Sequence, residues 1–275
     1  MVFIKVNFGG FVSLSSVDWR GRSVCTVFLR GCPLQCSYCQ NDLIQTGEDT
    51  REVDEIAGMI RTSQPFISGV VFSGGEPTMQ QDALIALAKE VKQMNLLVGI
   101  QTNGFFPGTL EHLIEKRLVD KVSIDYKTRW EGFTKRWEGF CNIPKENYQK
   151  NVRESIRLCK KAHREEVLSE FEVIVTVFPG NEDDVREISK EVGNVVFVLA
   201  QGEHKIRSMD TTKQKGSNGE YMYRKKLLQE RHPPLSLNDL TRLADDLGRK
   251  VKIRTREGGE LLYESDRGRR VSRKR

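Results

Sequence analysis

The sequence has 275 residues, of which 38% are hydrophobic and 30% are charged, and its mean hydropathy is -0.48. These values exclude a chain of apolar membrane spans and a disordered, highly charged chain, and they favour a globular fold. No apolar run approaches the ~20 residues that cross a bilayer, and the first residues lack the features of a secretion signal. We therefore expect a cytoplasmic protein without a membrane partner.

The net charge of +6 is distributed unevenly along the chain. Residues 201–275 contain 20 Lys and Arg against 11 Asp and Glu, whereas residues 1–200 carry a small negative excess. The densest basic run lies within residues 267–275. Such a segment could bind a polyanion such as RNA, and it could equally be a solvated tail that confers solubility.

Six apolar, β-branched runs predict strands over residues 23–30, 68–73, 96–102, 121–126, 171–178 and 194–200. Helical periodicity lies between them: Val53, Ile56, Ala57 and Ile60 repeat at i, i+3, i+4 and i+7. This alternation is typical of an α/β fold, either an open parallel sheet or a partial barrel. In both arrangements ligands bind at the carboxyl ends of the strands.

The pattern changes after Gln201, which we predict to end a first region over residues 1–201. Residues 202–234 are polar and predict a long loop. The leucines from Leu237 to Leu247 predict one more helix, and residues 251–255 predict one more strand. Outside this loop, residues 202–275 leave too short a segment to fold as an independent domain.

Three of the six cysteines, Cys32, Cys36 and Cys39, stand together in the loop after the first predicted strand. Three thiolates at this spacing can bind one metal centre. A structural zinc site would need a fourth protein ligand, and no His or further Cys follows nearby. A [4Fe–4S] cluster with one open iron fits better. The isolated Cys141 and Cys159 indicate no second cluster.

The C-x3-C-x2-C sequence, with Tyr38 before the third cysteine, resembles the signature of the radical S-adenosylmethionine (SAM) superfamily. The resemblance implies a partial (β/α)6 barrel and an oxidoreductase. In that family the open iron binds SAM, and an electron from the cluster cleaves SAM to methionine and a 5′-deoxyadenosyl radical. Tyr38 and Gln40 would line the adenine side. A tyrosine in such a loop could equally be a structural lid.

Two further strand ends match the family. Gly74, Gly75 and Glu76 follow the second strand, where the absence of two Cβ atoms allows a close ligand and a carboxylate can accept hydrogen bonds from an ammonium group. They resemble the GGE motif, which binds the SAM amino group. Thr102 and Asn103 end the third strand and offer polar partners for ribose or methionine groups.

The fourth strand ends in Asp125 and Lys127, two residues apart and therefore on one face. A plain surface ion pair would look the same. The pair resembles the Asp-x-Lys of glycyl-radical activating enzymes, whose side chains contact the methionine end of SAM. Residues 177–180 resemble the V-x-P-G turn of the same subfamily. Gln201, at the end of the sixth strand, matches a polar position that faces SAM.

The segment Ser16-Val17-Asp18-Trp19 resembles the lead-in of activating proteins for anaerobic ribonucleoside-triphosphate reductase. Arg20 replaces the usual proline, and Gln40-Asn41 replaces the commoner His-Asn. The resemblance implies that the chain installs a glycyl radical in anaerobic ribonucleotide reductase. It also implies an electron donor such as flavodoxin or ferredoxin. No catalytic residue is assigned beyond the cluster and SAM ligands.

Residues 129–133 recur as residues 136–140, both reading Arg-Trp-Glu-Gly-Phe. These aromatics could cover a substrate, dock a partner protein, stack on nucleobases or cap the barrel. Together with the basic C-terminal region they support an alternative function, radical modification of tRNA or another RNA. A non-enzymatic alternative is an iron–sulfur or zinc-binding interaction module, which would leave the strand-end motifs unexplained.

Overall fold

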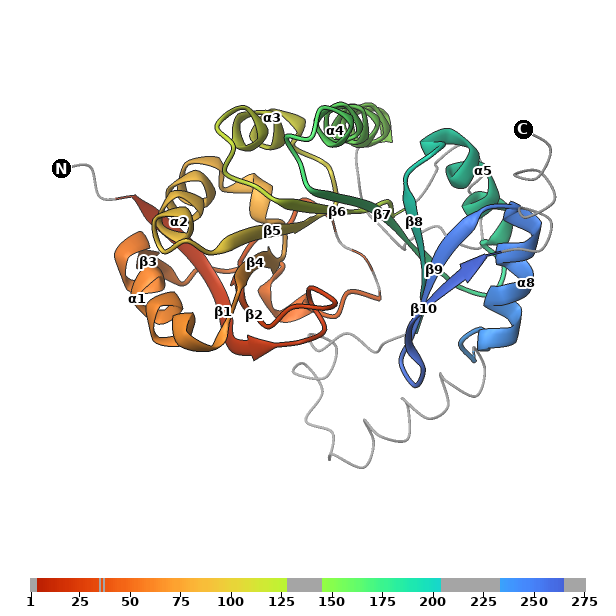
Figure 1. Cartoon of the computed structure of the whole chain (residues 1–275), viewed down its shortest axis with the longest axis horizontal. Helices are drawn as coiled ribbons and strands as arrows, with labels where there is room; N and C mark the ends of the chain where they lie inside the picture. Colours follow the sequence, from red (N-terminus) through yellow and green to blue (C-terminus); the bar gives the residue numbers. More distant parts are fainter. Residues whose placement is uncertain (1–3, 35, 37, 128–144, 204–232, 265–275) are drawn as a thin grey trace. The chain divides into compact units, whose positions relative to one another are not determined.

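A computed structural model of the chain describes residues 4–34, 36, 38–127, 145–203 and 233–264. The chain divides into two compact units. The first comprises residues 1–35, 41–124 and 143–171, and the second comprises residues 36–40, 125–142 and 172–275. In each unit strands pair side by side and helices lie on their outer side (Figure 1).

The first unit is built on a sheet with strand order β6-β5-β4-β2-β1-β3. Strands β2, β4, β5 and β6 are parallel neighbours, and β1 is antiparallel to both β2 and β3. The parallel strands are almost wholly buried, which explains their continuous apolar runs. The strands are β1 (Lys5–Ser15), β2 (Val24–Leu29), β3 (Thr50–Glu52), β4 (Gly69–Gly74), β5 (Leu97–Thr102) and β6 (Lys121–Asp125).

The helices of the first unit follow the predicted periodicity. In the first of them Ile56, Ala57 and Ile60 are fully buried, as the i, i+3, i+4 spacing requires. Helices α1 and α2 lie next to each other, and so do α3 and α4 (Figure 1). The α-helices are α1 (Val53–Ser63), α2 (Gln81–Gln93), α3 (Pro107–Glu115) and α4 (Lys145–Arg164), and short 3-10 turns are η1 (Asp42–Ile44), η2 (Gln64–Phe66) and η3 (Pro77–Met79).

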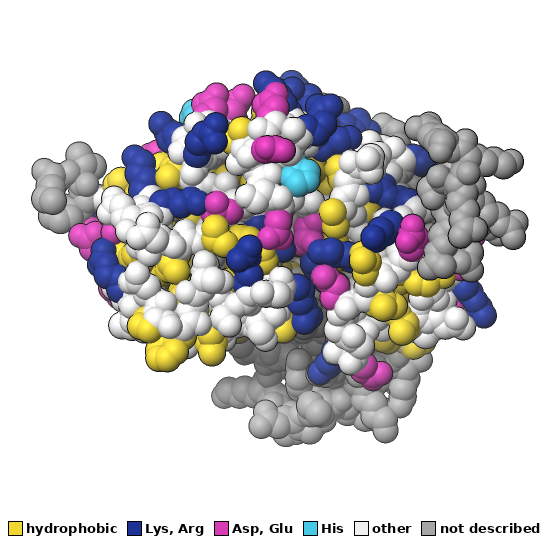
Figure 2. All heavy atoms as spheres, viewed as in Figure 1, with side chains coloured by type: hydrophobic (Ala, Val, Ile, Leu, Met, Phe, Trp, Pro, Cys, Tyr) yellow, Lys and Arg dark blue, Asp and Glu magenta, His cyan; other side chains and the backbone are white. Residues whose placement is uncertain are grey.

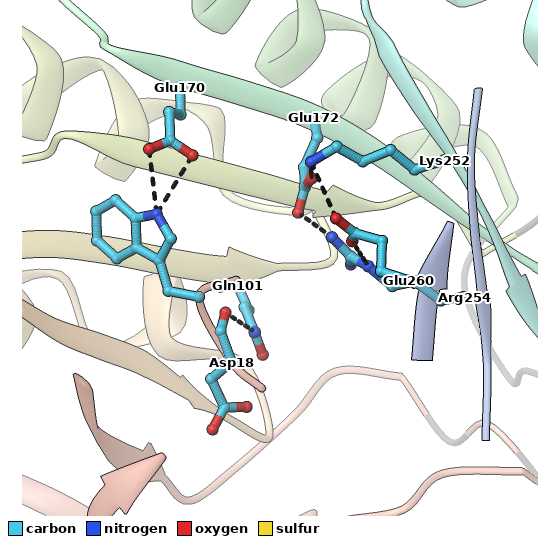
Figure 3. A network of polar contacts seen from close by, with 8 residues as sticks. Asp18, Gln101, Glu170, Glu172, Lys252, Arg254 and Glu260 are labelled. Atoms are coloured by element: carbon cyan, nitrogen blue, oxygen red, sulfur yellow. Dashed lines mark hydrogen bonds and ion pairs between the residues drawn. The ribbon is translucent and has the colours of Figure 1, made fainter. Parts of the chain in front are cut away.

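Trp19 anchors the chain segment that precedes β2. Its ring is 1% exposed and packs against β5, where a Cβ on Gly99 would stand 2.9 Å from the ring. The indole Nε1–H donates to both carboxylate oxygens of Glu170, each at 3.2 Å. Gln101 donates to the backbone carbonyl of Asp18 at 3.2 Å (Figure 3). Within the segment that resembles the activase lead-in, Trp19 is therefore part of the core of this unit, whereas Val17 is 61% exposed.

The second unit has the strand order β10-β9-β8-β7. Strands β7, β8 and β9 are parallel, and β10 is antiparallel to β9. The predicted helix and strand after residue 236 are confirmed; a capping box between Ser236 and Asp239 begins the helix, and Gly248 with φ 62° ends it. The elements are β7 (Glu170–Val177), α5 (Glu182–Val192), β8 (Val196–Gln201), α8 (Leu237–Leu247), β9 (Lys250–Thr255) and β10 (Gly259–Glu264).

Four charged side chains link β7, β9 and β10 (Figure 3). Arg254 donates to Glu172 at 2.9 Å and to Glu260 at 2.5 Å, and the Lys252 ammonium lies 3.4 Å and 3.5 Å from the same two carboxylates. The Glu172 side chain is only 4% exposed. Burial acts to lower the pKa of Arg254, but the charges and hydrogen bonds of Glu172 and Glu260 outweigh it and raise that pKa. The two positive charges of Lys252 and Arg254 therefore balance the two negative charges of Glu172 and Glu260.

We predict that Glu172→Ala lowers the free energy of unfolding by about 3 kcal/mol, because it leaves two partly buried cations with one carboxylate. Urea unfolding of the metal-free chain, followed by circular dichroism, measures this change. Glu165→Ala is the matched control, since Glu165 is exposed, and should stay within about 0.5 kcal/mol of the parent. Equal stabilities of the two variants would contradict a structural role for the network.

Figure 2 shows Lys, Arg, Asp and Glu side chains interspersed with hydrophobic side chains over the face in view. Within the described ranges, no helix has the length and apolar character needed to cross a membrane.

Candidate active site

The first unit holds the start of the cysteine loop in a fixed position. Beyond β2, the Gly31 N–H donates to the Ile44 carbonyl at 2.8 Å, and the Cys32 N–H donates to the Gln45 carbonyl at 3.0 Å. The Arg30 guanidinium also bonds to carbonyls of the segment that contains η1. The loop is thus attached to the fold on both sides of Gly31.

The N–H groups of Leu34 and Asn103 point to the Cys32 sulfur. The Leu34 backbone N–H lies 3.4 Å from Sγ, and Asn103 Nδ2 lies 3.7 Å from it. In the second unit, the Cys39 N–H donates to the Cys36 carbonyl at 3.1 Å and forms a turn between these two cysteines. Thiolates with N–H donors are the usual surroundings of an iron–sulfur cluster, so the donor chemistry fits.

The three predicted cluster ligands are divided between the two units. Cys32 belongs to the first unit, and Cys36 and Cys39 belong to the second. Among the described residues, no three Cys, His, Asp or Glu side chains form a group that could hold a metal ion. The convergence of these thiolates on one cluster therefore stays a prediction.

The glycines at the end of β4, Gly74 and Gly75, make room for the backbone of the cysteine loop. A Cβ on Gly75 would lie 2.1 Å from the Gly31 carbonyl oxygen, and one on Gly74 would lie 2.4 Å from the Leu29 carbonyl oxygen. The Gly75 N–H donates to the Leu29 carbonyl at 2.8 Å, and the Glu76 N–H donates to the Gly31 carbonyl at 2.7 Å. Gly74 also has φ 121°, which favours glycine. The close approach of the Gly31 and Leu29 backbone thus explains why glycine is needed at both positions.

Glu76 is a fully buried carboxylate that joins the ends of β4 and β5. Oε1 accepts the Thr78 N–H at 2.9 Å, the Thr102 hydroxyl at 2.6 Å and the Thr78 hydroxyl, while Oε2 accepts the Asn103 N–H at 2.7 Å. Burial raises the pKa of Glu76, and these hydrogen bonds partly offset that effect. The sequence suggested that this carboxylate accepts from a ligand ammonium; its donors in the structure are protein groups. A role of the Glu76 side chain toward SAM stays a prediction.

The second unit brings together three predicted site residues. Lys127 Nζ lies 2.9 Å from the Asp125 carboxylate and 5.8 Å from the centre of the Tyr38 ring. The Tyr38 ring also packs on Phe178, with 4.9 Å between ring centres. Lys127 is 18% exposed, so its charge is held close to these partners. An ammonium beside a carboxylate and an aromatic ring can bind a carboxylate ligand while the ring supports a flat group.

Phe178 lies in the V-x-P-G turn that the sequence analysis singled out, whereas the place of Gly202 in this cluster was not predicted. The Phe178 ring leaves no room for a side chain at residue 202, where a Cβ would stand 2.6 Å from it. Asn181 fixes the Phe178 backbone by accepting its N–H at 2.9 Å. A glycine directly after a strand end is the signal that could have suggested such a close approach, but it also reads as an ordinary turn.

Gln201, predicted to face SAM, uses both ends of its amide within the second unit. Its Nε2 donates to the Leu235 carbonyl at 2.7 Å, and its Oε1 accepts the Arg256 N–H at 3.2 Å. Gln40 is exposed. The neighbouring Asn41, in the first unit, donates to the Gly74 carbonyl at 3.0 Å. Binding of SAM by Gln40 and Gln201 stays a prediction.

Two other cysteines are core residues. Cys25 and Cys159 are both fully buried. Burial raises the pKa of Cys25 to about 12 and raises the pKa of Cys159 as well, so both remain thiols at neutral pH. Cys141 and the aromatic repeat of residues 129–140 lie outside the described residues.

The sequence profile described as the Radical SAM superfamily matches residues 26–192. This span covers more than half of the chain and includes the cysteine loop and the ends of β4, β5, β6 and β7. The chain therefore belongs to the radical SAM superfamily. Its members use a [4Fe–4S] cluster and SAM, which confirms the predicted cofactors.

Curated relatives include proteins that are named as activating enzymes. A Methanocaldococcus jannaschii protein with the provisional name glycyl-radical enzyme activating enzyme is 32% identical over 204 residues, covering 74% of this chain and 82% of the relative. The pyruvate formate-lyase-activating enzyme of Clostridium pasteurianum is 33% identical over 122 residues, covering 42% and 50%. The 7-carboxy-7-deazaguanine synthase of M. jannaschii is 25% identical over 198 residues, covering 65% and 75%.

Solved structures confirm the predicted fold class. TYW1 with a lysine–pyruvate adduct bound superimposes with a TM-score of 0.57 at 13% identity, covering 88% of this chain and 80% of that chain. Native anSMEcpe with bound AdoMet gives a TM-score of 0.52 at 18% identity, covering 79% and 56%. At these identities the similarity concerns the fold, the partial barrel of radical SAM enzymes.

Proposed function

We propose that this radical SAM enzyme installs a glycyl radical in a partner protein, and that the partner is an anaerobic ribonucleotide reductase. The relative that is 32% identical over 82% of its own length carries the proposal, because its name assigns it to the activation of glycyl-radical enzymes. The Asp125–Lys127 pair beside Tyr38 supports it, since this pair is the strand-end feature that resembles the activases.

The cofactors supply a 5′-deoxyadenosyl radical that can remove a hydrogen atom from a glycine Cα. In the proposal Cys32, Cys36 and Cys39 hold the cluster through their thiolates. Lys127 binds the carboxylate of SAM, and Asp125 keeps the ammonium in place at 2.9 Å. The Tyr38 ring, supported by Phe178, provides a flat apolar surface for the adenine.

The reductant in this proposal is a small electron-transfer protein such as flavodoxin or ferredoxin. A reduced cluster is needed for each cleavage of SAM, and the chain has no second cysteine set among its residues that resembles a further cluster. Dithionite replaces the protein donor in the test below.

A second candidate is radical chemistry on a nucleobase-like small molecule. The similarity to a 7-carboxy-7-deazaguanine synthase, over 75% of that protein, favours it. Modification of RNA is the related alternative that the excess of basic residues in 201–275 suggests. Each alternative predicts a different product, so one experiment can distinguish them.

The test uses the anaerobically reconstituted full chain with dithionite, SAM and the anaerobic ribonucleotide reductase of the same organism. We expect a glycyl radical in the reductase, seen as a doublet by electron paramagnetic resonance. Lys127→Ala should reduce 5′-deoxyadenosine formation by roughly tenfold or more, because a charge-assisted bond to SAM is lost. Lys116→Ala, a change of an exposed lysine, should leave it unchanged.

A shortened chain that ends at Glu264 lacks the basic tail but keeps β10, so it tests whether the tail is needed. This chain should still activate the reductase. A SAM-dependent modified nucleoside in tRNA, lost together with salt-sensitive tRNA binding in the shortened chain, would replace the activase with an RNA-modifying enzyme. A carboxylated deazaguanine product without any glycyl radical would favour the small-molecule candidate.

A further inference from the structure

The amide of Asn103 is held in one orientation by contacts on both sides. Its Oδ1 accepts the Phe105 N–H at 2.9 Å, so the amide oxygen is directed toward the start of the following loop. The Nδ2 group is then the end that faces Cys32 Sγ, at 3.7 Å. Reversal of the amide would set an NH2 group against the Phe105 N–H, which the hydrogen-bond pattern opposes.

Burial and the backbone fix the position of Asn103 as well. The residue is 5% exposed, and its own N–H donates to Glu76 Oε2 at 2.7 Å. Glu76 is in turn bonded by groups from the ends of two strands, as described above. Asn103 therefore lies in a buried, hydrogen-bonded frame within the first unit, and its Nδ2 group donates toward the Cys32 sulfur.

A thiolate that receives N–H bonds is electronically different from one that receives none. Reduction adds one negative charge to a cluster and its thiolates, and N–H dipoles aimed at a ligand sulfur stabilise the more negative state. Such donors make reduction more favourable. Among the described residues, the Leu34 backbone and the Asn103 side chain both direct such donors at Cys32. Of these two donors, the side chain can be removed by substitution without changing the backbone.

We propose that Asn103 sets the reduction potential of the cluster through its hydrogen bond to Cys32. The proposal rests on the proposed function only in its requirement for a cluster on Cys32, and it holds for any substrate of the enzyme. It gives Asn103 a role different from a contact with SAM, because the amide is directed at a cluster ligand. Asn103 is a positioning residue that acts through that ligand.

The test is a redox titration of the reconstituted full chain without SAM, followed by electron paramagnetic resonance of the reduced cluster. Asn103→Ala should shift the midpoint potential to a more negative value, with iron and sulfide contents unchanged. Asn103→Asp keeps the size of the side chain and the bond to Phe105, but it replaces the donor by a carboxylate. Its potential should be more negative still.

Asn151→Ala is the matched control. Asn151 lies in the same unit and donates from Nδ2 to the Phe105 carbonyl at 2.9 Å, so the variant loses an asparagine bond beside Asn103 but none to sulfur. Its midpoint potential should equal that of the parent chain. Because SAM is absent, a change of SAM affinity cannot produce the expected shift.

The outcomes separate this proposal from the proposed function. A full cluster in Asn103→Ala with an unmoved potential would overturn the proposal and leave the enzyme class intact. Loss of iron from both Asn103 variants, with iron retained in Asn151→Ala, would also overturn it, because Asn103 would then hold the cluster in place instead of adjusting its potential. Absence of iron from the parent chain would count against the cluster itself.

Discussion

Replacing Cys32, Cys36 or Cys39 by Ala is expected to abolish cluster binding altogether. Each variant retains two of the three thiolates that the cluster needs, so anaerobic reconstitution should yield little iron instead of about four iron and four sulfide per chain. Iron and sulfide analysis, together with the visible absorption of the cluster, measures the loss. SAM cleavage under dithionite should disappear with the iron.

The buried cysteines provide the control for this loss. Cys25→Ala and Cys159→Ala remove thiols whose pKa is raised by burial, so neither thiol is poised to bind iron. Both variants should keep the full iron content, at a cost in stability of the size usual for a small cavity. Stoichiometric zinc in the parent chain, with no iron uptake, would contradict the cluster.

A single methyl group at Gly75 is expected to disable the site. Its carbon would lie 2.1 Å from the Gly31 carbonyl oxygen, and both partners are backbone, so neither can rotate away. Gly75→Ala must therefore shift the end of β4 or the start of the cysteine loop. We expect the free energy of unfolding to fall by about 3 kcal/mol and SAM cleavage to be lost. Thermal unfolding and 5′-deoxyadenosine formation measure the two effects.

Gly58→Ala tests whether the effect at Gly75 comes from this close approach. Gly58 lies inside α1, and a Cβ there would meet no atom within 4 Å. Alanine should stabilise the helix by about 0.5–1 kcal/mol and leave SAM cleavage unchanged. If Gly75→Ala behaved like Gly58→Ala, Gly75 would have no role in positioning the loop.

The parallel strands and their helices were predictable because each has a simple periodicity. The parallel strands are buried on both faces and therefore read as continuous apolar runs, and α1 shows its buried face in Ile56, Ala57 and Ile60. Strand β1 was not predicted. Gly9 and Gly10 interrupt its apolar residues, and irregular pairing with β2 near Gly10 disturbs the two-residue alternation. The hairpin strand β10 was not predicted either, since its leucines are adjacent and partly exposed.

The candidate site was predictable as a set of strand ends, but the contacts within it were not. Glu76 stands beside two glycines and resembles a ligand-binding carboxylate, yet its donors include Thr102 at the end of β5 and Asn103 directly after it, 26 and 27 positions further along the chain. Such long-range bonds leave no local pattern in the sequence. The bond from Asn103 to Cys32 joins residues 71 positions apart and is hidden for the same reason.

Because Trp19 is buried, its presence in the sequence gives little information about the partner of this enzyme. A residue that fills the space over Gly99 and bonds to Glu170 is needed by the fold, whatever reaction the enzyme performs. Two radical SAM enzymes with unrelated substrates could therefore share Asp-Trp at this place, and a search for activases by this signature would collect both. Residues that discriminate between substrates should be sought where a side chain is not needed by the core.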